Sequence, residues 1–144
     1  MRDLRGKAII APLTIRANPC FLFFMDLDGY RRGIELFNRG KFFDAHEVLE
    51  DVWRASPSEE KKFLQGLIQI AVGLHHHSTG NNLGARSLLA RADKNLSAYG
   101  QGLAGLQLAP LRVSLASWIK ALDNGHAIPP LPRMELSMSP KPAV

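Results

Sequence analysis

The densest group of side chains that could do chemistry lies within residues 41–54, where His46, Glu47 and Glu50 occur together. A helix turns by about 100° per residue, so His46 and Glu50 would project from one face, a single turn apart. A histidine beside a carboxylate can act as a general acid–base pair, and the same two side chains can bind a divalent metal. His46, Glu47 and Glu50 are therefore the catalytic candidates.

The same stretch also carries an apolar stripe, which gives it a second interpretation. Phe42, Leu49 and Trp53 fall within about 40° of one another on a helical projection. His46 lies inside this stripe, and Glu50 lies at its edge. Because buried polar groups must be hydrogen bonded, the cluster could instead be a structural network that fixes which helix faces meet. The two interpretations remain open at this stage.

A metal site needs more than two ligands, and the run His75–His77 offers them. If the helices containing His46 and this run are antiparallel, His46 lies level with His75 or His76. The metal candidates are therefore His46, Glu50, His75 and His76, with a divalent metal as the cofactor to test. Three consecutive helical residues point about 100° apart, so at most two can serve one site. His77 is expected to be solvated near the end of its helix.

Polar residues on the third predicted helix suggest a ligand site beside this group. Gln65, Gln69 and His76 form one narrow stripe on an otherwise apolar helix. Together with Trp53 and Arg54, the two glutamines are candidates for ligand binding between the second and third helices. Trp53 is also interpreted as an anchor in the core.

Five helices are predicted from apolar spacings of three and four residues and from their boundary residues. They cover residues 26–40, 41–55, 57–79, 82–99 and 110–124. The third helix is predicted to begin with a capping box made by Ser56, Pro57 and Glu59. Gly66 and Gly73 on this helix would let a neighbouring backbone approach closely.

A weak internal repeat at an offset of 40 residues relates the two helical pairs, matching Gly40 to Gly80 and Ala45 to Ala85. The predicted fold is all-α: a five-helix bundle of two tetratricopeptide-like αα hairpins and a closing C-terminal helix. The helical domain spans 25–126, followed by a Pro-rich extended tail at 127–144. Residues 1–24 are expected to lie outside the domain, as a disordered extension or because Met25 is the natural start.

Composition restricts the classes of partner and the compartment. The formal charge is +5, but much of it comes from residues 1–24, and the rest of the chain has no basic stripe. Nucleic-acid binding is therefore not expected. The single cysteine, Cys20, cannot form an internal disulfide and fits a cytoplasmic location. The longest apolar run is too short to cross a membrane.

Several motifs resemble one family. They are Phe37-Asn38-Arg39-Gly40, Ala45-His46-Glu47-Val48-Leu49-Glu50 with Trp53-Arg54, Phe63-Leu64-Gln65-Gly66-Leu67-Ile68-Gln69, and Gly80-Asn81 with Gly84-Ala85. Over residues 30–98 the chain resembles the domain-of-unknown-function family 309, with Phe43 where members often have Trp or Tyr. The resemblance implies a small all-helical prokaryotic domain and no established activity.

Two functional hypotheses follow. The first is a small cytoplasmic binding module that takes a protein partner or a small-molecule ligand at the polar cluster between the second and third helices. The alternative is a metal-dependent or acid–base enzyme, hydrolase-like, that uses the same cluster. Because small bundles often leave apolar residues exposed, a homodimer is also expected.

Overall fold

The computed structural model describes residues 25–137 of the 144-residue chain, and this range contains five α-helices. They are α2 (Leu27–Asn38), α3 (Phe42–Arg54), α4 (Ser58–Ser78), α5 (Asn82–Leu96) and α6 (Leu108–Asn124), with a 3₁₀ turn, η2 (Ser97–Tyr99), after α5. Within these residues the only β-type pairing is an isolated bridge between Leu106 and Leu136. The all-α prediction is confirmed. The predictions for residues 1–24 and for the end of the tail, 138–144, lie outside the described residues.

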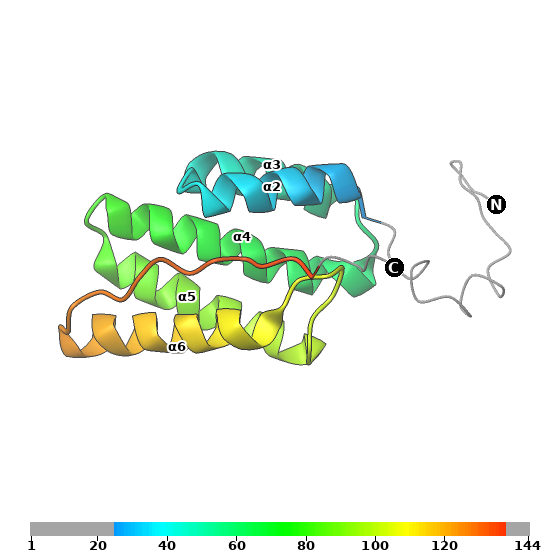
Figure 1. The fold of residues 1–144 in the computed structure, drawn as a ribbon. Coiled ribbons are helices and arrows are strands. Elements are labelled where there is room, and N and C mark those ends of the chain that lie inside the picture. The colour runs from blue at the N-terminus through cyan, green and yellow to red at the C-terminus, as the bar shows by residue number, and fades with distance from the viewer. Residues whose placement is uncertain (1–24, 138–144) are drawn as a thin grey trace, which may run out of the picture.

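Consecutive helices pack against one another, as Figure 1 shows. α2 and α3 form one antiparallel pair, α4 and α5 form the next, and α6 lies against α5. After α6 the chain turns back and crosses the bundle as an extended segment, residues 126–137 (orange to red in Figure 1). The arrangement contains two helical hairpins and a closing helix, whereas the likeness of these hairpins to tetratricopeptide repeats stays a prediction.

The α2–α3 hairpin is fixed by a cap, a glycine turn and a close contact. The Asp26 carboxylate accepts a hydrogen bond from the Gly29 N–H at 3.1 Å and caps α2. The turn passes through Gly40, whose φ of +83° lies in the left-handed region that glycine tolerates best. A Cβ atom at Gly33 would lie only 2.6 Å from the Leu49 side chain. Gly33 therefore allows α2 to approach α3 closely.

α4 is the central helix and packs against both α3 and α5. Its two glycines allow the close approach of a neighbour that the sequence predicted, and the structure shows that this neighbour is α5. A Cβ atom at Gly66 would lie 2.8 Å from Leu96 Cγ, and one at Gly73 would lie 3.3 Å from Leu88 Cβ. Side chains larger than hydrogen at these positions would push α5 away.

The capping box predicted at the start of α4 is wrong. Pro57 occupies the N-cap position, and no side chain caps the helix there. The Ser56 hydroxyl points back instead and donates to the Val52 carbonyl at 2.6 Å. Because the turn between the helices is short, Ser56 still lies within reach of a free carbonyl at the end of α3.

Two ion pairs join α5 to α6 on the surface. Arg86 contacts Asp123 at 2.8 Å, and Arg112 contacts Asp93 at 2.7 Å. The hydrogen bond from the Arg86 guanidinium holds the pKa of the Asp123 carboxyl below its ordinary value. α6 ends at Gly125, which adopts the left-handed conformation with φ +67°.

One apolar core runs through the bundle and includes residues from every helix as well as Met134 of the extended segment. Its largest fully buried side chains include Trp118, Tyr30, Phe37 and Phe63. In the described residues, no helix combines the length and the apolar character needed to span a membrane.

Candidate functional site

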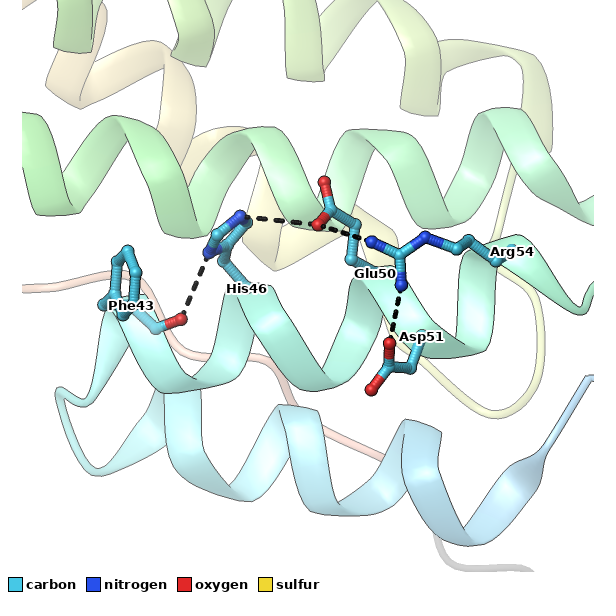
Figure 2. A network of polar contacts seen from close by, with 5 residues as sticks. All are labelled: Phe43, His46, Glu50, Asp51 and Arg54. Carbon is cyan, nitrogen blue, oxygen red and sulfur yellow. Dashed lines mark hydrogen bonds and ion pairs between the residues drawn. The ribbon is translucent and has the colours of Figure 1, made fainter.

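α3 carries the candidate acid–base pair on the side that borders α4. His46 Nδ1 lies 3.2 Å from the Phe43 carbonyl oxygen, and His46 Nε2 lies 3.8 Å from Glu50 Oε1, as Figure 2 shows. The His46 side chain is 20% exposed and the Glu50 side chain 40%. His46 therefore lies at the rim of the core, not inside it, and its contacts stay within its own helix.

Arg54 forms ion pairs with two carboxylates of α3. Its guanidinium donates to Asp51 Oδ1 at 2.7 Å and to Glu50 Oε1 at 3.4 Å. The Arg54 side chain is 61% exposed, so these are surface ion pairs one turn apart. Glu50 thus lies between the His46 ring and the Arg54 guanidinium. Glu47, the third catalytic candidate, is exposed.

Phe43 is the contact between α3 and α4 that the sequence analysis did not identify. Its side chain is 50% exposed, and its ring lies 5.3 Å from the His46 ring and 5.5 Å from the His75 ring. His75 of α4 and His46 of α3 therefore meet through an aromatic ring. One signal could have revealed it: Phe43 lies three residues before His46 on the polar side of α3.

The glutamine stripe of α4 faces another neighbour. Gln69 accepts a hydrogen bond from Asn95 Nδ2 on α5 at 2.9 Å, and Gln65 is exposed. The cluster predicted between the second and third helices is therefore divided. His46 and Glu50 stay with α3, whereas Gln69 pairs with α5, because α4 presents different faces to its two neighbours.

The other two histidines of α4 lie near the turn that follows this helix. His76 Nδ1 lies 3.5 Å from Asn81 Nδ2, and His77 Nδ1 lies 2.9 Å from Asn82 Oδ1. The His77 ring also meets the Trp118 ring edge-on at 5.0 Å. His77, expected to be solvated, is partly covered, since its ring contacts Trp118 of α6.

The metal candidates do not assemble into a ligand set. Among residues 25–137, no group of three or more His, Cys, Asp or Glu side chains is placed to hold a metal ion. His46 and His75 approach the same phenylalanine ring, and His76 turns towards the α4–α5 connection. A three-ligand site at His46, Glu50, His75 and His76 would need these side chains to rearrange.

Trp53 is half-buried and packs against the core. Its ring is covered by Lys61, whose Nζ lies 4.3 Å from the ring centroid. Its Nε1 is buried and has no hydrogen-bond partner among the described residues. This environment fits the interpretation of Trp53 as a core anchor, and it leaves little of the indole for a ligand.

A comparison with family models matches one stretch of the chain. Residues 30–88 match a family described as a domain of unknown function (DUF309). The match covers less than half of the chain, and we call residues 30–88 the DUF309 stretch. The DUF309 stretch contains α3, α4 and the start of α5, and so it includes Phe43, His46, Glu50 and His75.

Two curated relatives match part of this chain and are themselves uncharacterized. YpuF of Bacillus subtilis (strain 168) is 34% identical over 76 residues, which are 52% of this chain and 44% of the relative. A protein of Aquifex aeolicus (strain VF5) is 32% identical over 91 residues, 62% of this chain and 27% of the relative. The chain therefore matches less than half the length of both relatives.

Proposed function

We propose that this chain is a protein-binding module whose docking surface is the α3–α4 face. We define this face by Phe43, His46, Glu50 and Arg54 of α3 and His75 of α4. The observation that carries the proposal is Phe43, which is half-exposed although the rings of two helices hold it in place. A large, pre-positioned aromatic ring at the surface is a common anchor of protein interfaces.

The charges around Phe43 indicate the chemistry of the partner. α3 carries Asp44, Glu47, Glu50 and Asp51, against Arg54 as its basic residue. A partner that presents an apolar side chain to Phe43 and basic side chains to this acidic rim would match the face. Because the rim is exposed, the electrostatic part of such binding should weaken as salt is added.

The relatives support a module that works beside other sequence. The aligned region makes up a smaller share of the Aquifex aeolicus protein than of YpuF, although it is longer. Sequence similar to this chain therefore occurs in proteins with different amounts of additional sequence. A domain that contributes a binding face suits this use.

Affinity capture from an extract of the native host tests the proposal. The immobilised wild-type chain is compared with Phe43→Ser and with Val113→Ser, a matched control on α6 whose side chain is 68% exposed. We expect a protein retained by the wild type and by Val113→Ser but lost with Phe43→Ser. With that partner purified, Phe43→Ser should weaken binding by at least about tenfold, as loss of an interface anchor does.

Two results would contradict the proposal that the α3–α4 face is the docking surface. Equal retention by all three chains would place any interface elsewhere, and so would the absence of a protein that depends on Phe43. Thermal unfolding of the variants serves as the control. Since Phe43 is half-exposed, Phe43→Ser should unfold at a temperature close to that of the wild type. A loss of retention then reflects the missing ring and not misfolding.

One observation favours the second candidate, a metal-dependent or acid–base hydrolase. His46 Nε2 faces Glu50 Oε1 at 3.8 Å, within reach of a shared proton or cation after a small movement. Metal analysis of untagged protein, repeated on His46→Ala, tests it. Stoichiometric metal that disappears in the variant would support this candidate over the binding module.

A further inference from the structure

The extended segment after α6 lies in a groove of the protein. On one side of the groove is α2, and on the other is the loop before α6, where Leu106 forms the β-bridge with Leu136. A hollow of about 400 Å³ remains between α2 and the segment, lined by Arg31, Glu35 and Asn38 and by residues 133–136. The groove is thus built from parts far apart in the sequence.

Hydrogen bonds hold the segment through its main chain. Asn38 Nδ2 donates to the Met134 carbonyl, and the Met134 N–H donates to Asn38 Oδ1, both at 2.9 Å. Across the groove, the Gln107 N–H donates to the Glu135 carbonyl at 3.0 Å, and the Ser137 N–H donates to the Gly105 carbonyl at 2.6 Å. The segment is therefore held in an extended conformation through its backbone, by the Asn38 side chain on one edge and by the main chain of residues 105–107 on the other.

Side chains of the segment alternate between the groove and solvent. Pro132 is buried, Met134 is 1% exposed and Leu136 is half-buried, whereas the residues between them are exposed. This period of two is typical of an extended strand with one buried face. The occupant of the groove is therefore an extended peptide whose apolar residues, at every second position, face the bundle.

The connection to α6 is a separate, exposed piece of chain. Gly125 adopts the left-handed conformation, and residues 126–128 are exposed. Pro129 and Pro130 follow, and the Pro130 carbonyl accepts a hydrogen bond from Trp118 Nε1 at 2.9 Å. The contacts of residues 132–137 do not depend on residues 126–128, so the same contacts could form with the segment of another molecule.

We propose that the groove between α2 and Leu106 is a peptide-binding site that also accepts the C-terminal segment of a second copy of this chain. Exchange of segments 130–137 between two copies then gives a dimer. A second copy is the occupant that fits, because it carries the sequence already seen in the groove. The exchange conserves each hydrogen bond and changes only the path of the connection, which makes it a low-cost route to a dimer.

Exchange is expected to depend on concentration. In a monomer the segment is tethered beside its own groove, at an effective concentration in the millimolar range. Dimers should therefore form when the protein is refolded at high concentration, and they should be rare when it is refolded dilute. This inference does not rest on the α3–α4 face.

Mixing two full-length variants tests the exchange directly. Met134→Asp disables the segment and leaves the groove intact. Asn38→Leu, a change of similar size, disables the groove and leaves the segment intact, because two main-chain groups of the segment lose their partner. A mixture of the two variants has one intact pairing, which joins the groove of Met134→Asp to the segment of Asn38→Leu.

We expect tagged Met134→Asp to retain untagged Asn38→Leu after the two are refolded together, with the mass of a dimer in light scattering. The matched controls are mixtures of tagged and untagged chains with the same substitution, in which no intact pairing exists. Retention that is no greater in the cross mixture than in these controls would overturn the proposal. If circular dichroism shows that Met134→Asp has lost its helices, Met134→Ser replaces it in the same test.

Discussion

At the scale of single residues, burial decides what each aromatic side chain contributes. Phe43 is half-exposed between two histidine rings, whereas Tyr30 is 1% exposed and donates its hydroxyl to the Leu103 carbonyl at 3.4 Å. Burial raises the pKa of the Tyr30 phenol above its ordinary value, since the phenolate would lose its hydration. Phe43 is available to a partner, and Tyr30 makes the stability of the fold depend on pH.

The raised pKa of Tyr30 predicts a loss of stability at alkaline pH. In the unfolded chain this phenol ionises at about pH 10, whereas the folded chain keeps its proton to higher pH. The unfolded state then binds fewer protons, so the free energy of unfolding falls as the pH rises above about 10. Tyr30→Phe should reduce this fall, measured by urea denaturation at about pH 8 and about pH 10.5. An equal fall in both proteins would contradict this role.

Gly33 predicts a steric effect that can be isolated. Gly33→Ala would place a Cβ atom 2.6 Å from the Leu49 side chain, so we expect the free energy of unfolding to drop by about 1–3 kcal/mol. The same substitution in a Leu49→Ala background should cost less, because the clashing atoms are gone. A double-mutant cycle by chemical denaturation measures the difference. If the two losses in free energy of unfolding are additive, the strain caused by Gly33→Ala does not come from Leu49.

At the scale of the elements, one lysine joins the end of α3 to the start of α4. Lys61 Nζ donates to the carbonyls of Trp53 and Arg54 while lying 4.3 Å from the centroid of the Trp53 ring. The last carbonyls of a helix lack partners within the helix, and the negative end of the helix dipole attracts a cation. Lys61 therefore fixes the corner beyond which α4 packs against α3.

Lys61→Met tests this corner. Methionine keeps an unbranched side chain but removes the charge and the donor, so we expect a loss of about 1–2 kcal/mol in the free energy of unfolding. Lys62→Met is the matched control, because Lys62 is exposed and adjacent. The fluorescence of Trp53 should also change with Lys61→Met. Similar stabilities for the two variants would contradict the role of Lys61 at the corner.

At the scale of the whole molecule, the extended segment connects the ends of the bundle. The helices pack mainly with their neighbours in sequence. The first and last described helices, α2 and α6, are therefore not joined by a main helix–helix contact. The segment closes this gap through Asn38 on α2 and Trp118 on α6. Met134, which belongs to the core, anchors it.

Met134→Ala should lower the free energy of unfolding by about 2–5 kcal/mol, because it leaves a cavity in the core. Leu131→Ala is the matched control in the same segment, since the Leu131 side chain is 53% exposed. Hydrogen exchange in Met134→Ala should accelerate first in the segment and in α2. Equal costs for the two substitutions would mean that the segment lies on the bundle without anchoring it.

Local sequence signals predicted most of the helices and fewer of their contacts. Apolar spacing and the turn at Asn124-Gly125 were sufficient to predict where α6 ends. Its start was predicted at Pro110, whereas the helix begins two residues earlier, at Leu108. Proline is tolerated anywhere in the first turn, so it does not mark one position. The docking of the extended segment has no local signature, because its partners lie far away in the sequence.

The candidate site was predicted less well, for a geometric reason. Helical phasing placed Glu50 correctly at an edge, but it does not give the rotation of α4 relative to α3. That rotation brings His75 to Phe43 and turns Gln69 towards Asn95. Sequence spacing on a single helix can therefore identify a face, whereas the choice of partner depends on packing between helices.

The pairing of Asn38 with Met134 also has a consequence for folding kinetics. These residues are 96 positions apart, whereas the hairpins join residues that are much closer in sequence. Contacts between nearby residues form early, and closure of so long a loop is expected after the transition state. Substitutions at Met134 should then accelerate unfolding and leave the folding rate almost unchanged, as stopped-flow chevron plots would show. The segment would act as a late-forming latch that sets how long the folded molecule lasts.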